Sequence, residues 1–411
     1  MIKYFTVENY YSVKNESVLE FDLNLKKELP FLAQPVIGFA GANASGKSTI
    51  LKALTFTLWF ASESFLKLED KKETPVNTFI TNKENSCKFH IIFVIEETDY
   101  EYILEVTTQK VISEEFYYYS NEQQKLVYDR KEQKVKFGKK INKFELAELR
   151  ENSSIISFAA QFETQIFAKK IKEYNEFPTN IPAGKQFREI KFSPAHVDKS
   201  LKDNFLKEKM IELLKYADLG IDDFSIQKDR EELFSKLEEM RKLISDDKKE
   251  AFDKQIQDIK NNENSAIIKA FFKHNINGQL ISFEANEENE SSGTLQSFAL
   301  FFHLVQALDK GSLAIIDELE LKIHQNLVAY MIGLFQNPEV NTKNAQLIFS
   351  FHNTAFMEIL SPEQLWFAEK NEKGHSDFYC AANVTDIPNI HKKNLETLYR
   401  IGRFGAKPKL L

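Results

Sequence analysis

The chain has 411 residues, a formal net charge of −7, 43% hydrophobic residues and 28% charged residues, which excludes an intrinsically disordered protein and predicts two or three folded lobes. No apolar run approaches the roughly 18 residues of a membrane-spanning helix, the first residues lack a signal-peptide pattern, and Cys87 and Cys380 are too few for a disulfide framework. These features predict a cytoplasmic protein without membrane partners, and the acidic balance argues against a chain that coats nucleic acid over its whole surface.

The N-terminal part predicts a strand, a loop and a helix in succession. Residues 4–7 and 18–23 are β-branched or aromatic runs separated by a polar stretch, as in strands. A third predicted strand at 35–40 is nearly all apolar, and such strands belong inside a parallel or mixed sheet covered by helices. It runs directly into a glycine-containing loop at 41–49 and an apolar helix at 50–60.

The rest of the chain predicts an antiparallel meander, a helical hairpin and further buried strands. Residues 87–137 are strand-like. Apolar residues recur at helical spacing within the charged residues 198–264, which predicts an inserted helical hairpin. Strands at 266–272, 279–283, 313–316 and 346–351 and a helix at 294–308 follow. We predict an α/β fold, with helices on a mixed parallel sheet plus the meander and the hairpin, divided into residues 1–197, 198–264 and 265–411.

Residues 41–48 read G-A-N-A-S-G-K-S, a complete phosphate-loop motif with the required strand before it and helix after it. The glycines let backbone N–H groups form an anion nest, Lys47 can bridge the β- and γ-phosphates, and Ser48 can ligate Mg²⁺. A chance glycine turn is the alternative, and the flanking elements disfavour it. The predicted ATP ligands are Gly41, Asn43, Ala44, Ser45, Gly46, Lys47, Ser48 and Thr49.

Two carboxylates follow the buried strand at 313–316, at the edge of the sheet where ligands of α/β proteins collect. Asp317 is the predicted second Mg²⁺ ligand beside Ser48, and Glu318 is predicted to polarise the attacking water. An ordinary acidic turn is the alternative, which the phosphate loop makes less attractive. Glu320 is a weaker candidate for the base because it lies past the end of the strand.

Two further polar elements complete the pattern. His352 follows a buried strand that should neighbour the strand before Asp317, so its imidazole can reach the γ-phosphate or the water, although a structural or solvated histidine is the alternative. Ser291, Ser292 and Gly293 precede the helix at 294–308 and could bind an anion. Taken alone, these three residues are better explained as a helix N-cap.

The set of motifs and its order resemble the ABC-type ATPases of the SMC, RecF and OLD (overcoming lysogenization defect) group. Within that group the chain is most similar to the small stand-alone ATPases of abortive-infection and other antiphage defence operons. Residues 5–12, 290–294 and 399–408 also look like characteristic stretches of the group, so the resemblance covers nearly the whole chain.

The resemblance implies hydrolysis of ATP with Mg²⁺ in a head-to-tail dimer or higher oligomer. Each nucleotide would lie between Lys47 and Ser48 of one chain and Ser291, Ser292 and Gly293 of the other. By the same resemblance Glu318 serves as base and His352 as switch histidine in the closed state.

The resemblance also implies a nucleotide-gated switch that controls a separate effector such as a nuclease or another toxin. Too few residues follow His352 for the nuclease domain that OLD-type proteins carry. Two departures stand out: Tyr11 occupies a position where relatives often have arginine, and Gln161 is only a weak candidate for the magnesium-sensing glutamine. A nucleotide-bound scaffold with little turnover is disfavoured by the intact Glu318.

A DNA-binding ATPase of the RecF or SMC type, active in repair or tethering, is the alternative function. Residues 121–150 contain nine Lys or Arg against five acids, a pattern that a solvated strand face explains more readily than a nucleic-acid site. The cations are Lys125, Arg130, Lys131, Lys134, Lys136, Lys139, Lys140, Lys143 and Arg150, followed by Lys169, Lys170 and Lys172.

Overall fold

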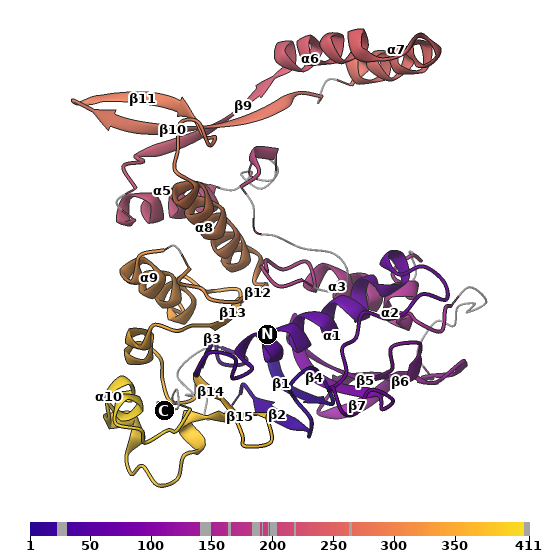
Figure 1. Ribbon diagram of the computed structural model, residues 1–411, viewed down its shortest axis with the longest axis vertical. Helices are drawn as coiled ribbons and strands as arrows, with labels where there is room; N and C mark the ends of the chain where they lie inside the picture. Colours follow the sequence, from indigo (N-terminus) through magenta and orange to yellow (C-terminus); the bar gives the residue numbers. More distant parts are fainter. Residues whose placement is uncertain are drawn as a thin grey trace. The chain divides into compact units, whose positions relative to one another are not determined.

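The computed structural model describes residues 1–22, 31–139, 149–162, 166–182, 190, 192–195, 197, 204–217, 219–262, 265–321 and 323–406. It contains two compact units (Figure 1): Met1–Ile190 together with Ala307–Leu411, and Lys191–Gln306. Because the first unit is built from two separate stretches of chain, the second unit is an insertion into it.

One sheet of the first unit has five strands and carries the predicted phosphate loop. Its strands are β3 (Val36–Ala40), β12 (Leu313–Ile316), β13 (Gln346–Ser350), β14 (Leu365–Lys370) and β15 (Ser376–Cys380). In the order β12-β13-β3-β14-β15, the first four are parallel and β15 is antiparallel. Every residue of β3, β12 and β13 is buried, as expected for central strands covered by helices. The predicted mixed α/β fold is confirmed.

A second sheet of the same unit is the antiparallel meander. Its strands are β1 (Ile2–Glu8), β2 (Ser17–Glu20), β4 (Cys87–Ile95), β5 (Thr98–Val106), β6 (Val111–Ser120), β7 (Gln123–Lys131) and β8 (Lys134–Phe137). They lie in the order β2-β1-β4-β5-β6-β7-β8 with antiparallel pairing throughout. The helices α2 (Ile155–Ala159) and α3 (Ile166–Tyr174) follow it in the chain.

Helix α1 (Lys47–Lys67) joins the cores of the two sheets, beside the meander in Figure 1. Most of its residues are buried, because apolar side chains occur all around it. The ring of Phe56 lies 5.2 Å from that of Phe89 on β4, while Ile50 and Leu51 share one buried cluster with Ile315 and Ile348 of the five-stranded sheet. Packing against both sheets therefore holds α1, the helix that follows the phosphate loop, along its length.

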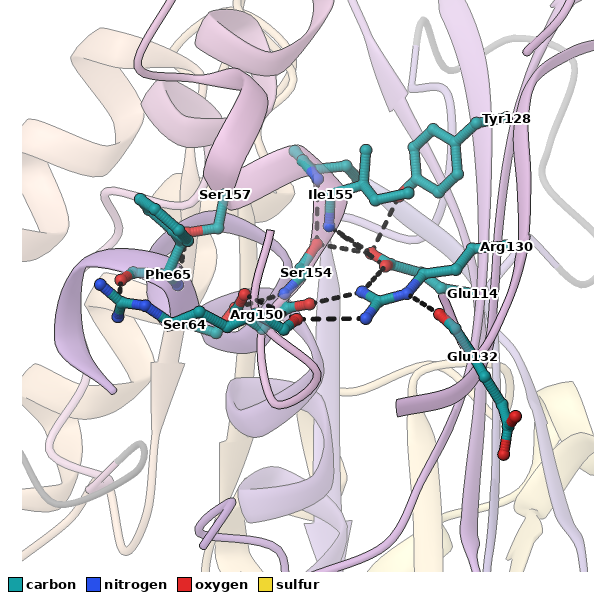
Figure 2. A network of polar contacts seen from close by, with 12 residues as sticks. Ser64, Phe65, Glu114, Tyr128, Arg130, Glu132, Arg150, Ser154, Ile155 and Ser157 are labelled. Atoms are coloured by element: carbon teal, nitrogen blue, oxygen red, sulfur yellow. Dashed lines mark hydrogen bonds and ion pairs between the residues drawn. The ribbon is translucent and has the colours of Figure 1, made fainter. Parts of the chain in front are cut away.

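A fully buried ion pair ties the meander to α1 and α2 (Figure 2). The carboxylate of Glu114 lies 3.4 Å from the guanidinium of Arg130 and also accepts the hydroxyl of Ser154, the N-cap of α2. Arg130 in turn donates to the carbonyl oxygen of Arg150 at 3.1 Å, and the Arg150 side chain donates to Phe65 O of α1 at 3.0 Å. These contacts satisfy buried polar groups that would otherwise be costly.

The second unit contains a three-stranded antiparallel sheet and the predicted hairpin. Its elements are α5 (Asn204–Tyr216), β9 (Asp223–Asp229), α6 (Arg230–Leu243), α7 (Asp246–Asn261), β10 (Ile267–Ile276), β11 (Gln279–Glu284) and most of α8 (Ser292–Lys310). The sheet order is β11-β10-β9. The sequence-based boundaries at 198 and 264 enclose only the charged residues around the hairpin. The compact unit, Lys191–Gln306, is larger because it also includes the sheet strands β10 and β11 and most of α8.

The remaining elements lie in the C-terminal part of the first unit. They are α9 (Gln325–Gln336), η1 (Thr354–Glu358), η2 (Ala381–Asn383), η3 (Ile390–Lys392) and α10 (Leu395–Arg400). Within the described part of the chain, no helix combines the length and apolar character needed to cross a bilayer.

Candidate functional site

The phosphate loop connects β3 to α1 in a conformation that requires its glycines. Gly41 and Gly46 have φ values of 147° and 116°, in a region that side chains rarely adopt. A Cβ atom at Gly41 would lie 2.2 Å from Ala368 O, and one at Gly46 would lie 2.3 Å from Ser376 Oγ. With Ala44 also left-handed at φ 60°, the loop has the alternation that forms an anion nest.

Lys47 begins α1 and lies over this loop. Its ammonium donates to the carbonyl oxygens of Gly41 at 2.9 Å and Ala42 at 3.1 Å, and the residue is only 5% exposed. Burial lowers the pKa of the Lys47 ammonium, and the negative charges of Asp317 and Glu318 oppose this effect. The Lys47 ammonium is therefore held against the backbone of the phosphate loop.

Two serines outside the loop, Ser376 and Ser12, anchor it through hydrogen bonds. Ser376 Oγ on β15 lies 2.7 Å from Ser45 O and 2.8 Å from Ser12 Oγ. Ser12 Oγ donates to the hydroxyl of Thr49 at 3.2 Å. The hydroxyl of Ser45 is buried without a hydrogen-bond partner among the described residues. An orphaned hydroxyl inside a glycine cradle fits a polar ligand such as a nucleotide phosphate.

The two predicted carboxylates stand at the carboxyl end of β12, where neighbouring residues hold their backbone. The amide of Asp317 donates to Asn180 Oδ1, and Asn180 Nδ2 donates to Asp317 O, both at 2.8 Å. Ser350, the last residue of β13, donates through its hydroxyl to the Asp317 carboxylate and accepts the Glu318 N–H at 2.8 Å. Motif reasoning assigns no role to Asn180 or Ser350, because neither belongs to a recognisable pattern.

His352 lies beside Glu318, as their adjacent strands predict. His352 Nε2 is 3.4 Å from Glu318 Oε1, and both side chains are partly exposed. Glu320 behaves differently: its Oε1 accepts the backbone N–H groups of His352 and of Asn353, the latter at 3.2 Å. Of the two glutamates considered as base, only Glu318 pairs with the histidine side chain.

One cavity of about 1180 Å³ in the first unit brings these groups together. Gly41 begins the loop but does not line the cavity. A pocket of this size is large enough for a nucleotide. The predicted site residues that line it are Asn43, Ala44, Ser45, Gly46, Lys47, Ser48, Thr49, Asp317, Glu318 and His352.

Other lining residues come from segments without a motif. Tyr11 contributes a half-exposed ring, with Lys52 Nζ 5.3 Å from its centroid and Asn77 donating to its hydroxyl at 2.8 Å. Lys370 at the end of β14 and Lys373 in the turn before β15 also line the cavity. Tyr11 belongs to the stretch 5–12 that the sequence singles out, whereas no local sequence signal marks Lys370 or Lys373, which only the fold brings to the phosphate loop.

Residues 36–358 match the family model described as "AAA domain, putative AbiEii toxin, Type IV TA system". The match covers more than half of the chain and includes the phosphate loop, both carboxylates and His352. The chain belongs to this AAA domain family. Among curated proteins, none matches it significantly. Membership confirms the predicted P-loop ATPase fold and the predicted relation to abortive-infection systems, and it indicates nucleotide binding.

The cavity of the AAA domain also fits the Mg²⁺ ion that usually accompanies such nucleotides. Among the described residues, no group of three or more His, Cys, Asp or Glu side chains could hold a metal ion. Mg²⁺ is typically bound by only one or two protein ligands, with water and phosphate oxygens completing its shell. Ser48 and Asp317, which line one cavity, match that donor set.

The three residues predicted to contact the nucleotide of another chain, Ser291, Ser292 and Gly293, are called the signature below and lie in the second unit. Ser291 Oγ accepts the N–H of Thr294 at 3.0 Å, which is the N-cap contact that the residues alone favour. Ser291 and Ser292 are exposed at the start of α8. A Cβ atom at Gly293 would meet only Ser291 Oγ, at 3.7 Å, so no described contact within the chain requires glycine there.

Two other predictions are placed by the structure. Gln161 is exposed just after α2, its amide donates to Ser157 O at 3.2 Å, and it does not line the cavity, in line with a surface residue. In the basic stretch, Arg130 is buried and Arg150 binds carbonyl groups of α1, so neither is a surface cation available to DNA. Lys140 and Lys143 lie outside the described residues. The exposed cations there are Lys131, Lys134, Lys136 and Lys139.

Proposed function

We propose that the protein binds ATP with Mg²⁺ and hydrolyses it to ADP and phosphate. The observation that carries the proposal is the single cavity lined by Lys47, Ser48, Asp317, Glu318 and His352. The nest and the Lys47 ammonium bind the β- and γ-phosphates. Ser48 and Asp317 would hold Mg²⁺, which would supply positive charge to neutralise the phosphates.

Glu318 is the proposed general base. Its carboxylate orients a water whose oxygen attacks the γ-phosphorus while the bond to the bridging oxygen breaks and ADP leaves. The proton of the water passes to the carboxylate. His352, 3.4 Å from that carboxylate, donates to a γ-phosphate oxygen and so reports the presence of the phosphate to the end of β13.

The proposed biological role is a dimeric switch in antiphage defence that gates a separate effector, such as a nuclease or another toxin. Ser291, Ser292 and Gly293 of a second copy would complete each site. The exposed hydroxyls at the start of α8 and the absence of any contact closer than 3.7 Å at Gly293 support this arrangement, because both leave room for a phosphate at a helix N-terminus.

Steady-state hydrolysis and nucleotide affinity of two variants test the proposal. We expect Lys47→Ala to lose nucleotide binding, because the nest then lacks its buried cation. Glu318→Gln should retain binding and lose hydrolysis by about 100-fold or more, the usual effect of removing a general base. Hydrolysis by Glu318→Gln at the wild-type rate would show that another group activates the water.

The alternative is a DNA-binding ATPase, supported by the four exposed lysines of β7, β8 and the residues that follow them. Duplex DNA added to the same assay separates the two functions. Salt-sensitive stimulation of hydrolysis favours the DNA-binding ATPase, since phosphate contacts release counterions. Indifference to DNA together with a co-purifying protein favours the gated effector.

A further inference from the structure

The carboxylate of Glu320 binds backbone N–H groups of the loop that follows β13. This loop carries His352 and is called the histidine loop below. It follows Glu318 by two residues, beyond the end of β12, and one of its carboxylate oxygens, Oε1, accepts the N–H groups of both His352 and Asn353. Two consecutive amides that share one acceptor are fixed in direction relative to it. Hydrogen bonds to a charged acceptor are stronger than those between neutral groups, so the loop is firmly tethered at this point.

This tether is the last of several links between the turn after β12 and the end of β13. The Glu318 N–H donates to Ser350 Oγ at 2.8 Å, and the Leu319 N–H donates to Ser350 O at 3.1 Å. Glu320 then extends the pairing to His352. The links before it use Ser350, so Glu320 alone among these residues acts on the backbone of the histidine itself.

We propose that Glu320 is a positioning residue that sets His352 against Glu318 and takes no part in proton transfer. The inference rests on the proposed ATPase function. Its accepting oxygen is already engaged by two amides, and its other oxygen is buried without a partner among the described residues, so neither is presented to a water in the way that the 46% exposed side chain of Glu318 is. Without Glu320 the two amides lose their acceptor and the 3.4 Å contact between His352 and Glu318 loses its support.

Two substitutions separate positioning from acid–base chemistry. Glu320→Gln keeps a side-chain carbonyl oxygen that can accept both amides, but it cannot act as a base. Glu320→Ala removes the acceptor altogether. We expect Glu320→Gln to keep kcat within about threefold of wild type, and Glu320→Ala to lower kcat by roughly 10- to 100-fold, because a misplacement of about 1 Å can cost that much. The Kd for ATP should stay unchanged in both, since the phosphate loop is untouched.

The matched control is Glu363→Ala, which removes a buried carboxylate of the same unit whose partner, His391, lies outside the cavity. It should reduce stability without a selective loss of kcat. If Glu320→Gln lost as much activity as Glu318→Gln, Glu320 would be part of the proton-transfer machinery. If Glu320→Ala kept full activity, the positioning role would be wrong.

Amide hydrogen exchange separates this inference from the ATPase proposal. The amides of His352 and Asn353 should exchange faster in Glu320→Ala than in wild type, and at the wild-type rate in Glu320→Gln. A wild-type protein that hydrolyses no ATP would refute the proposed function, yet the exchange comparison would still decide whether Glu320 holds the loop. Unchanged exchange in Glu320→Ala would overturn the inference.

Discussion

Glu318 has a left-handed backbone conformation, with φ of 52°. A non-glycine residue in this region carries strain of roughly 1–3 kcal/mol and persists only where its surroundings hold it. Here the hydroxyl of Ser350 accepts the Glu318 N–H, and Ser350 O accepts the next N–H in the chain. The strained backbone of Glu318 therefore costs local stability, and Glu318 is the residue whose carboxylate lies beside His352.

Asn180 supports Asp317 from the opposite side of β12. Its amide accepts from Asp317 N and donates to Asp317 O, and Pro178 O accepts the N–H of Ile315 at 3.1 Å. Asn180→Ala removes both side-chain bonds, so we expect kcat to fall about tenfold or more while the Kd for ATP stays within about twofold of wild type. Single-turnover hydrolysis and equilibrium nucleotide binding measure the two quantities separately.

Asn175→Ala is the control for that prediction. Asn175 lies in the same segment and is buried, but its amide donates to Leu58 O in the middle of α1, away from the carboxylates. Both variants lose an asparagine whose side-chain amide binds the backbone, Asn175 being buried and Asn180 partly buried, so both should lose stability. An equal effect of the two on kcat would mean that Asn180 acts only through general stability.

The contrast between these residues explains how much of the site the sequence could predict. Asp317 directly follows β12, His352 lies two residues after β13, and the loop that ends at Lys47 follows β3. The carboxyl ends of these parallel strands meet at one sheet edge. Asn180 reaches Asp317 from 137 positions away, and only the finished strand pairing brings them together. The same holds for Ser350, which binds the turn after β12, and for Glu320, which binds the loop after β13.

At the scale of elements, α1 connects the phosphate loop with the meander. Its first residue, Lys47, lies in the cavity, and its last turn is held by Arg150, which donates to Phe65 O. Arg150 also accepts from Arg130 through its backbone carbonyl, and Arg130 pairs with Glu114. The Glu114–Arg130 ion pair of the meander therefore helps to hold the C-terminal end of α1, the helix that follows the phosphate loop.

We expect Glu114→Ala to lower the free energy of unfolding by about 3–5 kcal/mol, because it leaves the fully buried Arg130 without its counter-charge. Urea denaturation of the variant at constant pH measures the loss. Glu115→Ala, on the same strand but only half-buried, is the control and should cost much less. Equal urea midpoints for the two variants would contradict the importance of the buried pair.

The buried Arg130 also shows where composition misleads. In the sequence it is one of nine cations in thirty residues, indistinguishable from the exposed Lys131 beside it. Strand alternation places neighbouring residues on opposite faces, so one cation is buried and the next is exposed. A charge count therefore overestimates the basic surface of β7 and β8.

At the scale of the whole molecule, the chain separates its two predicted phosphate-binding elements. The phosphate loop belongs to the first unit, and Ser291, Ser292 and Gly293 belong to the second. The order of motifs along the chain is compatible with either a site completed within one chain or a site completed by a second copy. A mixing experiment separates these arrangements without any knowledge of the effector.

We expect Lys47→Ala and Gly293→Asp to be inactive alone and to recover hydrolysis when mixed. Gly293 lies in the first turn of α8, where a carboxylate favours the helix and a side chain meets only Ser291 Oγ, so the variant should fold. Its charge would repel the phosphates of a nucleotide held by a second copy. A mixed dimer contains one intact phosphate loop facing one intact signature, which gives about a quarter of wild-type activity in a 1:1 mixture if subunits exchange randomly.

The control mixture combines Lys47→Ala with Glu318→Gln. Lys47 and Glu318 both line the cavity of the first unit. In a mixed dimer one site therefore lacks Lys47 and the other lacks Glu318, so both sites should stay inactive. Recovery in the first mixture alone therefore identifies completion in trans, because random subunit exchange occurs equally in both. If neither mixture recovers while each variant remains folded and exchanges subunits, the signature acts within its own chain, and a dimer is not needed for hydrolysis.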